Sequence, residues 1–412
     1  MKLLVIQEQH FTRLPNGEVW VDEQSNATFW DRYLNVFEEI VVCGRFTHAQ
    51  SNDTDKLMRS DRERVSFIEL PNFRGVGGLL KNLFNVMRII KSAINQSDCV
   101  IFRAPSPISM IAYPLVKASN KPYAVEIMNN PQTVFSKDSM KNFYQPLITF
   151  LMVSQTKSMC MSANGVSYVT AKVLQELYPS RAKKKGESKR YFESHYSTIC
   201  LEESHYSFSE FGATLPKPLI MIHTGKMQDN RKGQDIFIES IAKLRRKGYE
   251  VEGILVGDGV MRNDFENLGQ QLGISDSLNF VGWKAGYNAV QAELKKAHIV
   301  VFPSMGEGLP RSVIEAMANG LLCIGSKVDG ICELLEDNSL VSNINSDSFV
   351  NSIEYYLKNW EEVKSVRKKQ FDTSKEYENS KLEKRRTEFY FKLKEVCLEK
   401  QSKINLNKRI SL

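Results

Sequence analysis

The stretch FPSMGEGLPRSVIEAMANG, residues 302–320, decides the fold. An apolar run over 297–302 ends at Pro303, and a short turn containing glycine follows it. A helix is predicted to begin near Pro310 and to stop at Gly320. A buried strand, a loop and a helix are the repeating parts of an open parallel sheet. Ligands of such sheets bind outside the carboxyl ends of the strands, so this loop is a candidate binding site.

The same loop has the chemistry of an anion site. The amides of Gly308, Leu309 and the first helical turn at Pro310 are expected to point outward, where the helix dipole favours a phosphate. Glu307 stands in the loop, where its carboxylate can accept hydrogen bonds from sugar hydroxyls. Glu315 follows about two helical turns later and could reach the hydroxyls of a ribose.

The rest of the chain repeats this alternation of strands and helices, which predicts an α/β fold with two doubly wound units. In the first half we expect one helix over 79–94 and strands over 3–6, 39–43, 99–102 and 123–127. In the second half we expect one helix over 234–247 and strands over 219–223, 251–256, 277–281, 297–302 and 321–325. The polar, basic region from Arg181 to Pro218 is interpreted as a linker or insertion. The segment 381–400 is predicted to be a surface helix with many salt bridges.

A second loop, HTGKMQDNRKG at 223–233, lies between the first strand and the first helix of the second half. It offers Gly225 for close backbone approach and the cations Lys226 and Lys232 for a phosphate. A glycine loop with lysines is weak evidence alone, because a solvated turn has the same composition.

Together these strings resemble the retaining glycosyltransferase family 4, also called group 1. The pattern E-G-L-P-R-x-x-I-E-A-M-A-x-G is similar to the family signature, in which the first glutamate contacts the donor sugar and the second the ribose. The 223–233 loop is similar to the G-R…K-G element that binds the donor diphosphate. Lys226 replaces the usual arginine and would act as a point charge. Gly257, in LVGDG, and Val281, in NFVGW, match the segments beside the diphosphate and the base.

The resemblance implies a GT-B fold, in which two Rossmann-like doubly wound domains face each other across a cleft. Residues 1–210 would bind the acceptor, 211–380 the donor, and 381–412 would form a helix packing back on the first domain or the linker. The activity implied is transfer from a UDP- or GDP-sugar to a glycan or lipid-linked acceptor, with retention of anomeric configuration, in bacterial surface-polysaccharide synthesis. The implied catalytic residues are Glu307, Lys226 and Lys232. Donor binding would add Gly225, Gly257, Val281, Gly308, Leu309, Pro310 and Glu315.

No metal or cofactor is expected, since the two lysines and the helix dipole supply positive charge to the diphosphate. The alternative is a catalytically weak nucleotide-sugar-binding protein of the same fold. The replacement at Lys226 favours it, as does the lack of the histidine that the family often carries after the strand at 123–127. Glu126 is a candidate substitute for that histidine, or an ordinary strand residue.

Three further side chains, His10, Arg13 and Trp20, are expected in the loop after the first strand. They could contact the acceptor or simply anchor a surface loop. The pair Asp53 and Asp55 matches a metal-binding D-x-D motif but lies in a polar run, so we interpret it as a loop.

Composition limits the partners and the cellular location that we expect for the protein. The 412 residues carry a net charge of +7, which suits an anionic partner, although we expect no nucleic acid. Seven scattered cysteines without a C-x-x-C pair argue against a disulfide framework or a zinc site. Apolar runs are too short for a signal peptide or a membrane span, so a cytoplasmic protein is expected. Peripheral docking on the inner membrane face through helix 79–94 and the basic run Arg181–Arg190 is one alternative. In the other, that helix packs inward and the basic run is a solvated loop.

Overall fold

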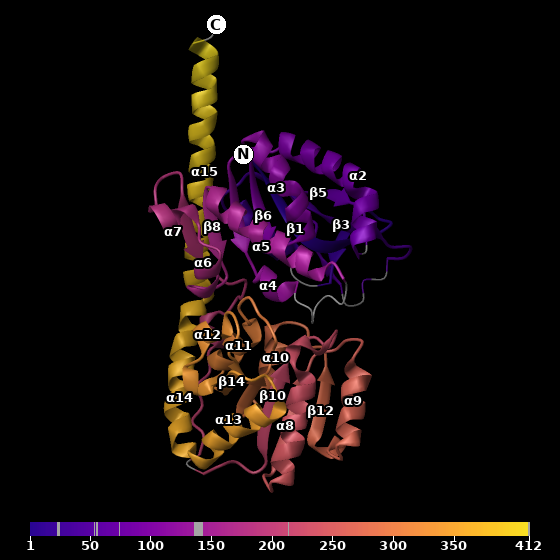
Figure 1. The fold of residues 1–412 in the computed structure, drawn as a ribbon, viewed down its shortest axis with the longest axis vertical. Helices are drawn as coiled ribbons and strands as arrows, with labels where there is room; N and C mark the ends of the chain where they lie inside the picture. Colours follow the sequence, from indigo (N-terminus) through magenta and orange to yellow (C-terminus); the bar gives the residue numbers. More distant parts are fainter. Residues whose placement is uncertain are drawn as a thin grey trace. The chain divides into compact units, whose positions relative to one another are not determined.

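The structure is a computed structural model that describes residues 1–22, 25–52, 54, 57–73, 75–135, 143–212 and 214–410 (Figure 1). The described residues divide into two compact units. The first unit comprises residues 1–132, 143–196 and 383–410. The second comprises residues 133–135 and 197–382. Because the C-terminal residues belong to the first unit, this unit is assembled from distant parts of the chain.

The first unit is built on a nine-stranded sheet whose parallel part has the order β5-β3-β1-β6-β7-β8-β9. Its strands are β1 (Lys2–Arg13), β2 (Val19–Val21), β3 (Glu39–His48), β4 (Met58–Arg59), β5 (Val65–Leu70), β6 (Cys99–Ala104), β7 (Tyr123–Ile127), β8 (Gly165–Tyr168) and β9 (Phe192–His195). Its helices are α1 (Asp31–Leu34), α2 (Gly75–Asn95), α3 (Pro107–Ser119), α4 (Pro131–Val134, at the division between the units), α5 (Gln145–Ser162), α6 (Val173–Leu177), α7 (Arg181–Lys185) and most of α15 (Asn379–Ile410).

The second unit is built on a six-stranded, all-parallel sheet in the order β12-β11-β10-β13-β14-β15. Its strands are β10 (Leu219–Thr224), β11 (Val251–Val256), β12 (Leu278–Gly282), β13 (Ile299–Phe302), β14 (Leu322–Ser326) and β15 (Leu340–Val341). Its helices are α8 (Gln234–Arg246), α9 (Arg262–Gln271), α10 (Tyr287–Leu294), α11 (Arg311–Ala318), α12 (Ile331–Leu334), α13 (Ser346–Lys358) and α14 (Trp360–Ser374). Both units are doubly wound, as the sequence predicted.

Two local predictions were wrong. The region interpreted as a linker begins with α7 and with β9, which pairs in parallel with β8 as the edge of the first sheet. This strand was not recognised in the sequence because only Phe192 of its four residues is buried. Likewise, β1 continues to Arg13 instead of giving way to a loop at Gln9, and Val19–Val21 folds back on it as β2.

Helix α2 packs on the first unit through only part of its apolar surface. Val86, Ile90 and Ile94 are buried. In its N-terminal half, by contrast, Leu80 and Phe84 are 62% and 86% exposed. The helix therefore packs inward through its C-terminal half and leaves an apolar surface near its start. None of the described helices is both long and apolar enough to cross a membrane.

Candidate active site

The second sheet reverses its strand order beside β10. From β10 the chain builds β11 and β12 on one side, and it then returns to place β13 and β14 on the other side. The loop after β10 and the loop after β13 consequently leave neighbouring strands and lead to different sides of the sheet. Ligands of open α/β sheets bind in the crevice at such a switch point. The two loops singled out in the sequence are therefore brought together where this fold binds ligands.

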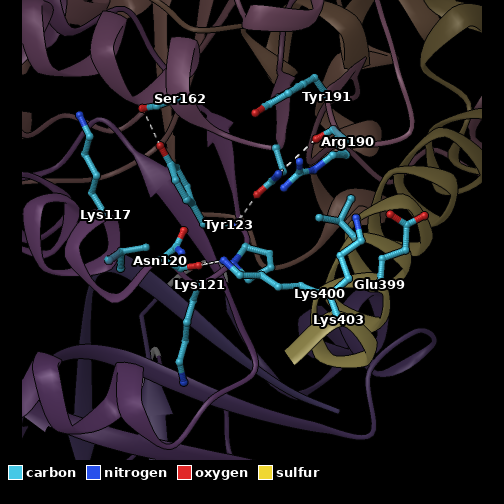
Figure 2. Close-up of a pocket in the computed structure, with 14 residues that line it drawn as sticks. Lys117, Asn120, Lys121, Tyr123, Ser162, Arg190, Tyr191, Glu399, Lys400 and Lys403 are labelled. Atoms are coloured by element: carbon cyan, nitrogen blue, oxygen red, sulfur yellow. Dashed lines mark hydrogen bonds between the residues drawn. The ribbon is translucent and has the colours of Figure 1, made fainter. Parts of the chain in front are cut away.

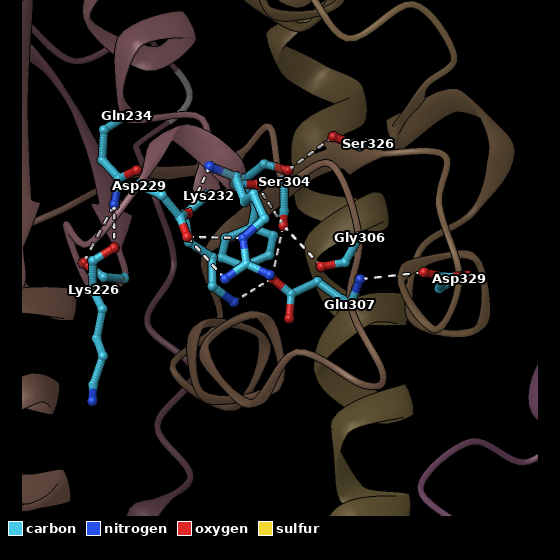
Figure 3. Close-up of polar contacts among 12 residues, drawn as sticks. Lys226, Asp229, Lys232, Gln234, Ser304, Gly306, Glu307, Ser326 and Asp329 are labelled. Carbon is cyan, nitrogen blue, oxygen red and sulfur yellow. Dashed lines mark hydrogen bonds and ion pairs between the residues drawn. The ribbon is translucent and has the colours of Figure 1, made fainter. Parts of the chain in front are cut away.

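An ion pair joins the two loops (Figure 3). Lys232 Nζ contacts Glu307 Oε1, and the Ser304 hydroxyl donates a 2.8 Å hydrogen bond to the same oxygen. The amide of Glu307 donates to Asp329 Oδ2 at 3.3 Å, which fixes the loop on the turn after β14. The lysine side chain is 34% exposed and the glutamate 11% exposed. A small ligand can therefore reach this pair from solvent.

Helix α11 begins directly beside this pair and has an open N-terminus. Its N-cap is Pro310, in an extended conformation, and no described side chain accepts a hydrogen bond from the first amides. A helix start carries about half a positive charge, which favours an anion such as a phosphate. The predicted helix from Pro310 to Gly320 is thus confirmed in position.

The glycine turns after β10, β11 and β12 are hydrogen-bonded in a row. Gly225 N donates to Val256 O at 2.9 Å, and Gly257 N donates to Gly282 O at 3.0 Å. Gly257 has φ +141°, and a Cβ there would lie 2.0 Å from the Gly225 carbonyl oxygen. Only glycine allows this approach. Val281, another residue predicted to bind the donor, lies half-buried near the end of β12 beside these turns.

The side chain of Lys226 is directed away from the Lys232–Glu307 pair in Figure 3. Its backbone is held by Gln234, whose Nε2 donates to the carbonyls of Gly225 and Lys226 at 3.4 and 3.0 Å. The two lysines predicted to bind one diphosphate therefore flank the loop and do not meet at one point.

Glu315 lies half-buried on α11, one turn from its C-terminal end. Burial raises the pKa of its carboxyl from 4.5 to about 7, and the charge of Arg311 opposes this shift. Asn319 Nδ2 bridges the carbonyl of Glu315 and the Tyr287 hydroxyl, each at 2.8 Å. Near neutral pH this carboxyl exists in both protonation states, so it can either accept or donate a hydrogen bond.

His223, near the end of β10, was not predicted as a site residue from the sequence. It is fully buried between Phe237 and Phe302, with ring centroids 5.7 Å away in both cases. Its Nδ1 lies 3.0 Å from Val301 O, and burial lowers its pKa to about 4, which keeps the ring neutral at pH 7. Ser304, Gln234 and Asp329 were also missed, since no local sequence pattern marks the hydrogen bonds that they form.

Glu126 in the first unit has no spare capacity for catalysis. Its Oε1 accepts hydrogen bonds from Tyr196 at 3.0 Å and Tyr390 at 2.6 Å. Its Oε2 accepts one from Tyr33 at 3.0 Å and pairs with Arg103 Nε at 3.3 Å. A carboxylate offers about four acceptor positions. The side chain is buried and fully used, so the structure favours the ordinary structural role over the histidine substitute.

The three acceptor candidates lie on the β1–β2 pair of strands, and two of them make structural contacts there. His10 lies exposed within β1. Arg13 pairs with Glu69 and donates to Gly17 O at 2.8 Å. Trp20 Nε1 donates to Glu18 at 3.1 Å. The last two side chains hold the β1–β2 hairpin. Asp53 and Asp55 lie outside the described residues.

Comparison with known proteins now identifies the second unit. Residues 209–372 match the family model described as glycosyl transferases group 1. This segment is a group 1 glycosyltransferase domain. Its bounds contain both loops of the Lys232–Glu307 pair and all the predicted donor residues.

Proteins similar to this chain include both curated relatives and solved structures. Protein CapJ of Staphylococcus aureus is 25% identical over 302 residues, which span 73% of each chain. The UDP-Gal:alpha-D-GlcNAc-diphosphoundecaprenol alpha-1,3-galactosyltransferase of Escherichia coli is 33% identical over 104 residues, 24% of this chain and 26% of that protein. Anabaena HepE, solved in complex with UDP, superimposes with a TM-score of 0.63 at 14% identity, covering 93% of this chain and 98% of that one. The predicted GT-B fold is confirmed.

Proposed function

We propose that this glycosyltransferase moves a sugar from a UDP-sugar to a glycan or lipid-linked acceptor, with retention of anomeric configuration. The observation that carries the proposal is the Lys232–Glu307 pair at the strand switch, beside the open start of α11. A cation and a positive helix end suit a diphosphate, and a carboxylate beside them suits sugar hydroxyls.

In this mechanism the bond between the anomeric carbon and the diphosphate oxygen breaks, and the carbon bonds to the oxygen of an acceptor hydroxyl. The hydroxyl proton passes to the departing diphosphate, on which negative charge grows. Lys232, Lys226 and the first amides of α11 stabilise that charge, which is often the largest catalytic contribution. When the diphosphate binds, Lys232 exchanges Glu307 for phosphate oxygens. The exchange frees the carboxylate of Glu307 to accept hydrogen bonds from the donor sugar.

The choice of UDP over GDP rests on HepE, which has been solved with UDP and with UDP-glucose. The choice of acceptor rests on the E. coli relative, whose name specifies a sugar linked to diphosphoundecaprenol. Synthesis of a bacterial surface polysaccharide is the setting that joins such a donor to such an acceptor.

We further propose that the enzyme works in the cytoplasm and docks reversibly on the inner membrane face through α2. Exposed Leu80 and Phe84 lie on this helix with the exposed cations Lys81, Arg88 and Lys91. A basic side chain near an anionic surface contributes about 1 kcal/mol, so apolar and basic groups together suffice for weak binding. Co-sedimentation with phosphatidylglycerol vesicles should fall when Leu80 and Phe84 are both changed to serine. Equal sedimentation of this variant and the parent would remove α2 from membrane binding.

The decisive experiment is UDP release from UDP-glucose and UDP-galactose, measured with and without polyprenyl-diphosphate-linked sugars. We expect release only with an acceptor, persistence of activity in EDTA, and a product that keeps the donor's anomeric configuration by NMR. Donor binding without release for any acceptor would favour the nucleotide-sugar-binding protein instead. Loss of activity in EDTA, restored by manganese, would show that a metal is required.

A further inference from the structure

A cavity lies in the first unit, at the edge of the sheet where β7 and β8 begin (Figure 2). Its volume is about 290 Å³. Its walls come from the end of α3, the starts of β7 and β8, the turn before β9, and one face of α15. Because ligands of this fold bind at the carboxyl ends of the strands, the cavity is separate from the acceptor region expected in this unit.

The lining of this cavity is strongly basic. Glu399 is its only carboxylate, against five cations. None of these cations forms an ion pair with a carboxylate in the part of the chain that the structure describes. The five are Lys117, Lys121, Arg190, Lys400 and Lys403.

Two of the cations are fixed in place by neutral oxygens. Lys121 Nζ donates to the carbonyls of Ile94, at 2.6 Å, and Ser97. Lys400 reaches across from α15 and donates to the carbonyl of Asn120, as Figure 2 shows. Carbonyl oxygens position an ammonium group but carry no net charge to neutralise it. The cavity therefore keeps an excess of positive charge at fixed points.

The cations also act on one another. Burial lowers the pKa of Lys400, and the positive charge of Arg190 lowers it further. Arg190 is itself exposed on the turn before β9, and its carbonyl accepts from Asn164 Nδ2 at 3.2 Å. Like charges held at short range destabilise each other, so an anion bound between them would relieve the repulsion.

We propose that this cavity binds a phosphate-bearing anion, either free in solution as pyrophosphate or as the headgroup of an anionic phospholipid. The volume holds about ten waters at about 30 Å³ each, which suits a compact group better than a whole nucleotide sugar. The guanidinium of Arg190 can pair with phosphate oxygens in bidentate geometry, while the lysines supply point charges. This site is independent of the function proposed for the second unit.

The test is titration calorimetry with pyrophosphate on the full chain carrying Lys232→Ala, which weakens binding at the competing donor site. Arg190→Gln with Lys403→Gln is the test variant. Lys184→Gln with Lys185→Gln, two exposed lysines of α7 outside the cavity, is the control matched in charge. We expect pyrophosphate to bind the parent and the control, with at least tenfold weaker binding to the test variant. Melting curves check that all three are folded.

A second arm uses co-sedimentation with phosphatidylcholine vesicles, with and without phosphatidylglycerol, at low and high salt. Sedimentation that requires phosphatidylglycerol, and that the test variant alone loses, assigns the cavity to a lipid headgroup. Pyrophosphate binding without such sedimentation assigns it to a soluble phosphate. Equal behaviour of test and control variants in both arms, or no binding in either, overturns the proposal.

Discussion

At the scale of single residues, the ammonium of Lys232 pairs with the carboxylate of Glu307 and is proposed to exchange it for the donor diphosphate. A charge-assisted hydrogen bond is worth about 1.5–3 kcal/mol, so Lys232→Ala should weaken UDP binding about 10- to 100-fold and reduce turnover. Titration calorimetry with UDP measures the first effect. Lys243→Ala, which breaks an exposed pair with Asp347 in the same unit, is the control and should leave the affinity unchanged. Equal affinity in both variants would exclude Lys232 from the site.

The two glutamates should differ in effect. Glu307→Gln should retain UDP binding and lose sugar transfer, because the side chain is proposed to contact the sugar. Glu315→Gln should weaken nucleotide binding, because its carboxylate is proposed to accept from the ribose. Calorimetry with UDP and a transfer assay separate the two roles. A similar loss of UDP affinity in both variants would contradict this division.

The raised pKa of Glu315 adds a pH dependence. The carboxylate form accepts more hydrogen bonds than the acid, so affinity for UDP-glucose should rise as the pH passes through about 7. The free energy of unfolding should have the opposite pH dependence. A carboxyl whose folded pKa exceeds its unfolded value stabilises the protein below about 4.5, and this contribution is lost as the pH rises through about 7. Both trends should be absent in Glu315→Gln, as calorimetry and urea unfolding at several pH values can show.

The candidate site residues of the second unit could be selected from the sequence because they lie in local strings. Glu307 and Glu315 share one loop and helix, and Lys232 lies in a recognisable glycine loop. The role of Glu126 could not be decided from the sequence, because its partners are distant in the chain. Tyr33, Tyr196 and Tyr390 lie 93, 70 and 264 positions away from it, and no local pattern predicts that they meet on one carboxylate.

At the scale of elements, Gly257 tests how closely the β11 turn must approach the β10 loop. In Gly257→Ala the new Cβ would meet the Gly225 carbonyl oxygen at 2.0 Å, so the loop must shift. We expect a loss of about 2–4 kcal/mol in the free energy of unfolding, together with weaker UDP binding. Gly248→Ala is the matched control, since its φ is +91° but nothing lies within 4 Å. It should cost about 1 kcal/mol and leave UDP affinity intact. Equal costs in urea unfolding would show that the close approach is unimportant.

Elements were predictable where apolar runs were continuous. All strands of the six-stranded sheet except β15 were predicted correctly. The central strands of this sheet are buried on both faces and therefore form continuous apolar runs. In the first unit β2, β4, β5, β8 and β9 were missed. Of these, β2 and β4 have two or three residues, β8 and β9 have four residues each, and both β5 and β9 have only one buried residue. Short edge strands carry little hydrophobic signal, so their pairing is decided by tertiary packing.

At the scale of the whole molecule, α15 completes the first unit through Tyr390 and its neighbours. Tyr390→Phe should lower the free energy of unfolding of the first unit by about 1–3 kcal/mol, because a hydrogen bond to a buried carboxylate is lost. Tyr355→Phe removes a hydrogen bond to exposed Glu362 and should change stability by less than about 0.5 kcal/mol. Urea unfolding followed by circular dichroism compares them. Equal stabilities would mean that Glu126 does not depend on this partner.

The place of α15 in the chain also governs the order in which the protein can be made. Synthesis proceeds from the N-terminus, so the strands of the first unit leave the ribosome early. They must wait for residues 383–410, which bury Phe389, Tyr390, Leu393, Val396 and Cys397 in the folded unit. The second unit, apart from residues 133–135, is complete in the chain by residue 382. The unit that is translated first is therefore the last to be finished, and until then Glu126 lacks one of its three tyrosines.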